Sequence, residues 1–186
     1  GGAPDNGSNY PAISGDGLKV AYLSGAQLSP GVRGTQIWQT TVGNLTDPST
    51  RRTVLVTRNM AGNPSSANPT FVASNHNGTT IAFTSQTQDL TPGVSTFDVH
   101  AYVADMTTGT PVIRLVDHNG AGSAGNAIMQ PRVSLSADGR YVGFSSTSSD
   151  LVPNDKNGFS DVFVADLQPT VPLIRLVSRS FLGDDS

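Results

Sequence analysis

Hydrophobic residues occur along this chain in short alternating runs. Segments of four to seven residues rich in Val, Ile, Leu, Tyr and Phe are separated by stretches of Gly, Pro, Asn, Asp and Ser. Such runs, bounded by turn residues, predict β-strands, and no segment keeps the i, i+3, i+4, i+7 spacing of an amphipathic helix for long enough to compete. The 20 glycines and 12 prolines among 186 residues suit many turns and few helices. The pattern predicts an all-β chain.

One hairpin pattern recurs three times at a fixed interval. Each copy has Ser or Asn, then Asp-Gly or Asn-Gly two residues later, then an alternating apolar run. The turn glycines Gly17, Gly78 and Gly139 are spaced 61 residues apart both times. An Asp-Gly or Asn-Gly turn between two strands predicts a type I′ hairpin, which needs positive φ at both central residues. The constant period predicts a repeat architecture.

Other features keep the same period. An aromatic residue follows each hairpin, at Tyr22, Phe83 and Phe144, and we expect these three to be buried at matching positions between repeats. Arg114 and Arg175 recur on the last apolar run of their repeats, where we expect them to face solvent. Each repeat holds four strand candidates, which in the third copy are residues 132–136, 140–146, 161–167 and 173–178.

A tandem series of four-stranded antiparallel units describes the blades of a β-propeller. We therefore predict one propeller array over the whole chain, built from three repeats of about 61 residues. Their approximate ranges are 1–62, 63–124 and 125–186.

The third repeat carries a resemblance to a known family. Its hairpin over 136–144 reads Ser-Ala-Asp-Gly-Arg-Tyr-Val-Gly-Phe, and residues 161–167 read Asp-Val-Phe-Val-Ala-Asp-Leu. This pair of motifs resembles the TolB-like β-propeller repeat, of the SPDG type. The second repeat has Asn77 for the turn aspartate, and the first has lost the Asp-Val-Phe segment. The resemblance implies a scaffold that holds protein partners across a loop face or a central channel; similar repeats also occur in oligopeptidases and polysaccharide lyases.

Three blades are fewer than a closed propeller needs. Propellers usually close with roughly four to eight blades, so three should leave an apolar face open at each end of the array. Two arrangements would cover these faces: further blades of a longer parent chain, or a second copy that pairs with the first into a six-bladed ring. The chain begins and ends in the same phase of the repeat, which favours a segment of a longer array.

Composition limits the partners and the compartment. The net charge is −3 and only 13% of residues are charged, which excludes a phosphate-binding surface and therefore nucleic acid. No apolar run approaches the roughly 18 residues that a membrane span requires, so we expect no membrane span. Loops rich in Ser, Thr, Asn and Gly are typical of exported β proteins, and they favour a periplasmic or extracellular location.

The long loops predict a binding face. The connections at about 25–34, 86–97 and 147–160 and the inter-repeat segments at about 58–67 and 118–130 should emerge together, because strands alternate in direction. Long loops on a rigid scaffold commonly carry recognition. We predict a face that includes Asp117, His118, Asn126 and Asp150 and that binds a protein or a glycan. The alternative is that these are solvated loop residues.

One loop has the residues of a calcium site. Asp155, Asn157 and Asp161, with Gly158 among them, supply oxygen ligands at a spacing similar to the first half of an EF-hand loop. The bidentate Glu of an EF-hand is missing. The alternative is a network of Asx turns that shapes the loop without metal. Calcium is the one candidate cofactor.

No catalytic site is predicted. The chain has no Cys and no Gly-x-Ser-x-Gly motif, and we expect His76 to lie on the face opposite His118, so that no triad or His cluster forms. The sequence thus favours a non-catalytic protein-interaction or assembly module. The alternative is the gating or substrate-binding propeller of a secreted hydrolase or polysaccharide lyase, with catalytic groups in another domain.

Overall fold

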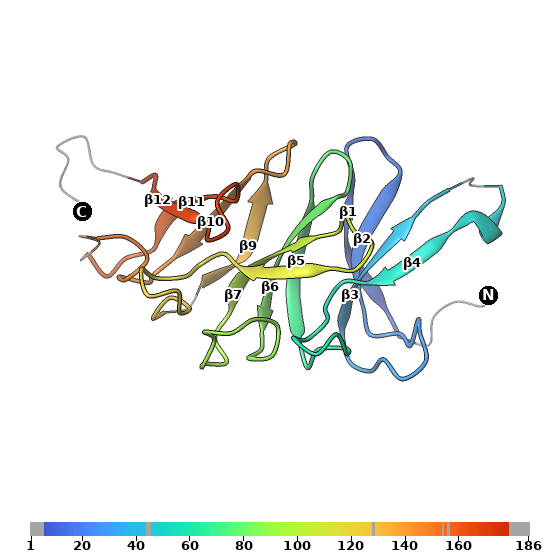
Figure 1. Ribbon diagram of the computed structural model, residues 1–186, viewed down its shortest axis with the longest axis horizontal. Helices are drawn as coiled ribbons and strands as arrows, with labels where there is room; N and C mark the ends of the chain where they lie inside the picture. The colour runs from blue at the N-terminus through green and yellow to red at the C-terminus, as the bar shows by residue number, and fades with distance from the viewer. Residues whose placement is uncertain (1–5, 44–45, 128, 154, 156, 179–186) are drawn as a thin grey trace.

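The computed structural model describes residues 6–43, 46–127, 129–153, 155 and 157–178. These residues form three four-stranded antiparallel sheets, each in sequential order (Figure 1). Blade 1 comprises β1 (Ser8–Ile13), β2 (Lys19–Ser24), β3 (Gln36–Thr41) and β4 (Arg52–Leu55). Blade 2 comprises β5 (Asn68–Ser74), β6 (Thr80–Gln86), β7 (His100–Asp105) and β8 (Val112–Leu115). Blade 3 comprises β9 (Met129–Leu135), β10 (Tyr141–Ser146), β11 (Asp161–Asp166) and β12 (Leu173–Leu176).

The all-β prediction is confirmed. Within the described part of the chain, the only helical segment is the 3-10 turn Pro48–Thr50. The three blades follow one another along the long axis of the molecule, from blue through green to red in Figure 1. The first strands of adjacent blades lie side by side, since β5 of blade 2 contacts β1 of blade 1 and β9 of blade 3.

Apolar side chains between the blades form the core. Phe83 and Tyr102 of blade 2 pack with Ile37 and Val56 of blade 1. Phe144 and Phe163 of blade 3 pack in the same way on blade 2. In each pair the aromatic rings stack, with centroids 5.4 Å apart in blade 2 and 5.6 Å apart in blade 3. Each junction therefore buries one aromatic pair, a geometry that adds to the gain from area burial.

The prediction of matching burial holds for Phe83 and Phe144 and is wrong for Tyr22. Phe83 and Phe144 are buried, whereas Tyr22 is half-buried because no blade of this chain precedes blade 1. The Tyr22 hydroxyl lies 3.1 Å from Thr40 Oγ1, which satisfies it at this open face.

The hairpin turns occur at the predicted places with a different geometry. Gly17, Gly78 and Gly139 have φ of 73°, 63° and 76°, but the Asp or Asn before each does not have positive φ. These are therefore not type I′ turns. In the first, the Gly17 amide donates to the Ser14 carbonyl at 2.8 Å, and Asp16 Oδ1 accepts from the Ser14 hydroxyl and the Leu18 amide. The aspartate side chain thus stabilises a longer turn in which only glycine is left-handed.

The turns also bind one another across the blades. The Asp16 amide donates to the His76 carbonyl, and the His76 amide donates to the Ala137 carbonyl, both at 2.9 Å. Arg114 crosses the second junction, where its guanidinium donates to the carbonyls of Leu167, Pro169 and Thr170. The expectation that Arg114 faces solvent is therefore wrong, while Arg175 is exposed.

Alanine at two equivalent turn glycines tests the packing of the hairpins. Gly17 and Gly139 both have positive φ, but a Cβ on Gly17 meets no atom within 4 Å, whereas a Cβ on Gly139 would lie 2.6 Å from Thr80 Oγ1 of blade 2. We expect Gly17→Ala to lower the free energy of unfolding by about 1 kcal/mol, the cost of a left-handed alanine. Gly139→Ala should cost clearly more. Urea unfolding measures both, and equal losses would contradict tight packing at the blade 2–blade 3 turn.

Candidate functional site

The long connections leave the blades on the side opposite the Asp-Gly and Asn-Gly hairpins (Figure 1). We call this side the loop face. It consists of the connections between second and third strands, residues 25–35, 87–99 and 147–160, and the inter-blade segments 56–67 and 116–128, in so far as the structure describes them.

Two equivalent aspartates tie these loops together. Asp89 Oδ2 accepts from the Ser66 amide at 2.8 Å, and Asp89 Oδ1 accepts from the Ser65 hydroxyl. Asp150 Oδ1 accepts from the Asn126 amide at 3.0 Å, and Oδ2 accepts from Asn119 Nδ2 at 2.9 Å. Each carboxylate thus joins a long connection to the inter-blade segment beside it. The structure brings Asn126 and Asp150, two residues of the predicted binding face, into direct contact.

The electrostatics of Asp89 agree with this role. Burial alone would raise the pKa of its carboxyl, but the hydrogen bonds from Ser65, Ser66 and Thr87 outweigh burial and lower that pKa below its ordinary value. The ionised form is therefore the one that the loop stabilises.

The inter-blade segments repeat one turn. Asn59 Oδ1 accepts from the amides two and four residues further along the chain, at 3.1 and 3.0 Å. Asn119 Oδ1 makes the same two bonds, each at 3.1 Å. The two turns are built alike, which gives the loop face a repeated and fixed backbone.

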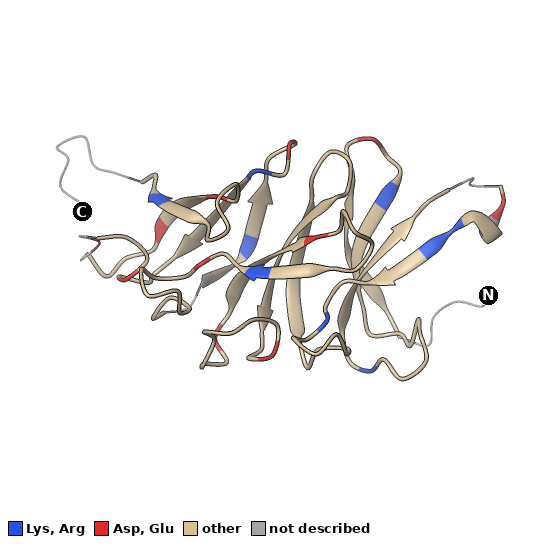
Figure 2. Ribbon diagram, viewed as in Figure 1, with Lys and Arg blue, Asp and Glu red and all other residues tan. Residues whose placement is uncertain are grey.

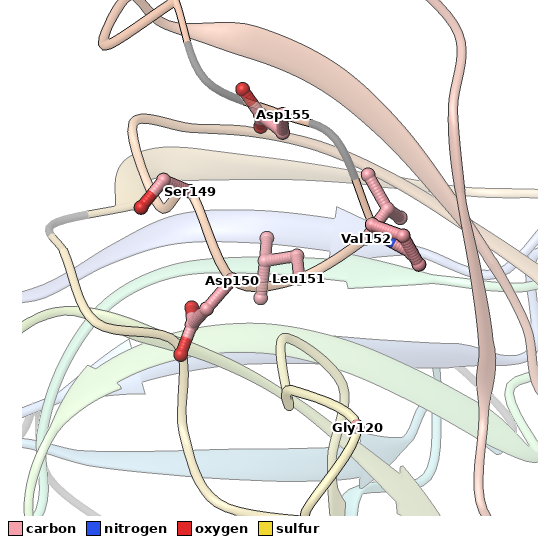
Figure 3. Close-up of a pocket in the computed structure, with 7 residues that line it drawn as sticks. Gly120, Ser149, Asp150, Leu151, Val152 and Asp155 are labelled. Carbon is pink, nitrogen blue, oxygen red and sulfur yellow. The ribbon is translucent and has the colours of Figure 1, made fainter.

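A cavity of about 670 Å³ opens between the second of these turns and the long connection of blade 3 (Figure 3). Its lining consists of Gly120, Ser149, Asp150, Leu151, Val152, Pro153 and Asp155. The corresponding place in blade 2 has a hollow of about 330 Å³, which includes Asn59, Leu90 and Pro92. Each hollow thus lies where a Leu-x-Pro step faces the inter-blade turn.

Large apolar side chains project from the loop face. Phe97 is 70% exposed, Phe159 is 75% exposed and Met60 is 64% exposed. None of these three residues is among the residues predicted for the binding face. A signal was present, since each Phe interrupts a polar loop two or three residues before a third strand.

Two residues of the predicted binding face, Asp117 and His118, lie in the inter-blade segment but are not fully accessible to solvent. Asp117 is fully buried, so its place on an exposed face was wrong: it caps β7, with Oδ1 accepting from the Ala101 amide and Oδ2 lying 2.8 Å from His100 Nδ1. Burial raises the pKa of Asp117, although the bond to His100 acts in the opposite direction. His118 is half-buried, and its ring nitrogens lie 2.9 Å from the Asn119 carbonyl and 2.8 Å from the Pro172 carbonyl of blade 3.

The His100–Asp117 pair has an equivalent in each blade. In all three blades, a residue at the start of the third strand binds a residue just after the fourth. The residue after the fourth strand also accepts a backbone amide of the third, from Ile37, Ala101 or Val162. The three pairs are Gln36 with Thr57, His100 with Asp117, and Asp161 with Ser178. This contact, which we call the strand clasp, holds the outer strands of each blade together.

Thr96 contacts the histidine of the second clasp. Thr96 is exposed and its hydroxyl lies 3.3 Å from His100 Nε2, so Thr96, His100 and Asp117 follow the order of nucleophile, base and orienting acid. The same positions in blades 1 and 3 hold Gln36 and Asp161, and neither is a histidine. Because equivalent pairs occur in blades 1 and 3, the His100–Asp117 pair is explained by its structural role as a strand clasp.

The predicted calcium residues take part in hydrogen bonds. Asn157 Nδ2 donates to Asp161 Oδ2 at 3.0 Å, and Asn157 Oδ1 accepts from the Phe159 amide at 2.8 Å. Asp155 is buried, and residues 154 and 156 lie outside the described part of the chain. Among the described residues, no group of three or more His, Cys, Asp or Glu could hold a metal ion. These bonds fit the Asx-turn alternative, and calcium stays a prediction.

The charges of the described residues are spread over all three blades, without a cluster of Lys and Arg (Figure 2). In the same residues, no helix is long and apolar enough to cross a membrane.

Comparison with solved structures confirms the propeller fold. The chain is similar to a putative TolB from Agrobacterium tumefaciens, with a TM-score of 0.50 and 15% identity over 91% of this chain and 48% of that one. It is also similar to the β-propeller domain of the Trilobed protease from Pyrococcus furiosus, with a TM-score of 0.50 and 13% identity over 96% of this chain and 45% of that one. The chain thus spans just under half the length of either. No family model and no curated protein matches it.

Substitutions at Asp117 test the strand clasp. Asp117→Ala should lower the free energy of unfolding by about 3 kcal/mol, because it leaves the Ala101 amide and His100 Nδ1 unpaired in a buried site. Asp117→Asn keeps an acceptor for the amide and should cost about 1 kcal/mol. Chemical denaturation measures both. Equal stability of the alanine variant and the wild type would contradict the clasp.

Calcium can be tested by thermal melting. An ion that binds only the folded loop raises the melting temperature by mass action. We expect equal melting temperatures in millimolar calcium and in EDTA, because the oxygens of Asn157 and Asp161 already accept hydrogen bonds. A calcium-dependent rise that Asp155→Ala abolishes would instead support the metal site.

Proposed function

We propose that this chain is a non-catalytic interaction module, a TolB-like propeller scaffold of an exported protein that holds a protein partner on its loop face. The observation that carries the proposal is the exposure of Phe97, Phe159 and Met60 on that face. Aromatic and Met side chains are enriched at protein interfaces, where a few buried anchors supply most of the binding energy.

The loops that carry these side chains are held in place before any partner binds. Asp89 and Asp150 join them to the inter-blade segments, and the Asn59 and Asn119 turns fix those segments in turn. A preorganised surface loses less conformational entropy on binding. This supports recognition by contact.

The chemistry of the face supports a protein or a glycan as the partner. Asn, Ser and Gly surround the exposed apolar side chains, and only 13% of the chain is charged, too little for a phosphate backbone. We favour a protein because the exposed Phe and Met side chains suit apolar pockets on a partner. The same loop composition and the TolB-like fold support a periplasmic or extracellular location.

The alternative function is the propeller of a secreted hydrolase or polysaccharide lyase. Among the residues that the structure describes, the alignment of Thr96 with His100 and Asp117 is the feature that favours chemistry. The equivalent clasps in blades 1 and 3 support a structural role for that pair.

Site-specific photo-crosslinking in extracts of the native host tests the face. A photoreactive residue at Phe97 or Phe159 should give a discrete protease-sensitive adduct, because both side chains project from the loop face. Leu18 is the matched control: it is 57% exposed and lies in a hairpin on the opposite side. Adduct formation is read by gel shift and mass spectrometry.

Three results would contradict the proposal. An equal yield from position 18 would show that the loop face is not the binding surface. A protease-resistant adduct would identify a glycan in place of a protein. Turnover of a peptide or polysaccharide by the purified chain that is lost in Thr96→Ala would show that it is an enzyme.

A further inference from the structure

The two faces of each blade have different neighbours. We call the face toward the preceding blade the front face and the opposite one the back face. The back face of blade 2 is covered by blade 3, because Ala82, Ala101, Val103 and Val116 pack against Val133, Val142, Phe144 and Phe163. Sixty-one residues later, the back face of blade 3 has Gly143, Val162, Val164 and Val177.

Equivalent positions on these two back faces differ sharply in exposure. Ala101 and Val116 on blade 2 are 0% exposed, whereas Val162 and Val177 on blade 3 are 44% and 57% exposed. The residues on the back face of blade 3 are as apolar as those on blade 2. This exposed face therefore has no polar substitutions that would suit contact with water. A face that is apolar and open, beside an equivalent face that is covered, indicates a missing partner.

The polar contacts of the junction show what such a partner must offer. Arg114 on the back face of blade 2 donates to three carbonyls in the turn between β11 and β12 of blade 3. Arg175 occupies the same position on blade 3 and is exposed. The partner should therefore present the front face of a blade and offer backbone carbonyls to Arg175.

This chain has one front face that no blade covers. On blade 1, Tyr22 and Thr53 are accessible to solvent above the buried Trp38 and Leu55. The Tyr22–Trp38 and Trp38–Leu55 pairs occupy the cross-strand positions that Phe83, Tyr102 and Leu115 occupy in blade 2. The front face of blade 1 thus has the same side-chain arrangement as the front face of blade 2, which packs on the back face of the preceding blade.

We infer that a second copy of this chain covers the back face of blade 3 with the front face of its blade 1. Two copies related by a twofold axis make this junction twice and leave no face open, since residues on each copy meet the complementary residues on the other. The product is a closed ring of six blades, within the usual range for propellers. This assembly is independent of what the loop face binds.

Sedimentation velocity over a range of concentrations tests the ring with the chain as it exists. The wild type should sediment as a species of twice the mass of the chain. Val162→Asp should convert it to a monomer, because the aspartate would be buried without a partner at each junction. Val162 is exposed in the single chain, so the variant should keep the wild-type circular dichroism spectrum.

Two further variants complete the test. Val112→Asp is the matched control, because Val112 is 55% exposed on the outer strand of blade 2, and this variant should remain dimeric. Thr53→Asp, on the front face of blade 1, should give a monomer as Val162→Asp does. A wild-type monomer at all concentrations would overturn the inference. Open oligomers larger than a dimer would also overturn it, and so would a dimer that persists in Val162→Asp. A dimer that persists in Thr53→Asp would show that two blade 3 faces pack together, which contradicts the inferred junction.

Discussion

The structure depends on the burial of blade faces against one another. A single four-stranded sheet with apolar side chains on both faces cannot bury those side chains by itself. Each blade is therefore stable only beside a neighbouring blade. At both junctions in this chain, a stacked aromatic pair fills the space against small or β-branched residues of the preceding blade. This contact repeats once per blade, which is why the apolar positions recur every 61 residues in the sequence. The same constraint explains why the two ends of the array differ from its middle.

Acidic side chains have structural roles throughout the molecule. Asp16 and Asp138 stabilise hairpin turns, Asp89 and Asp150 join loops, and Asp117 caps a strand. With so few basic partners in the chain, these carboxylates accept hydrogen bonds mainly from backbone amides and hydroxyls. Such bonds to an ionised acceptor are stronger than neutral ones, and they help to hold the loops in place.

The sequence predicted the architecture well because the period repeats the positions that packing fixes. The turn glycines, Phe83 and Phe144 all lie where the repeat places them. Side-chain placement near the strand ends was harder. Asp117 follows an apolar run and reads as the start of a loop, but the chain there continues alongside β7, which buries the carboxylate. Only a comparison of the three clasps shows that this position is internal.

The predicted site was less complete for a related reason. The polarity of a loop residue does not show whether it is available to a partner, since the Asn126 amide donates to the Asp150 carboxylate. Phe97 and Phe159 are exposed although an aromatic residue in a β protein is most often core, and only their place in a polar loop indicates this. Arg114 was misplaced because its three carbonyl acceptors are 53 to 56 residues away in sequence, beyond what a local pattern can reveal.

The hairpin-to-hairpin hydrogen bonds have a consequence for how the molecule opens. Blade 2 is bound on both sides, through the Asp16–His76 and His76–Ala137 backbone contacts, whereas blades 1 and 3 each have one such neighbour. In a one-dimensional array, the free energy of opening a unit grows with the number of neighbours that it must leave. In the single chain, fluctuations should therefore start in the end blades and move inward, so that amide hydrogens in the middle blade exchange with solvent last, whereas closure of the ring gives each end blade a second neighbour.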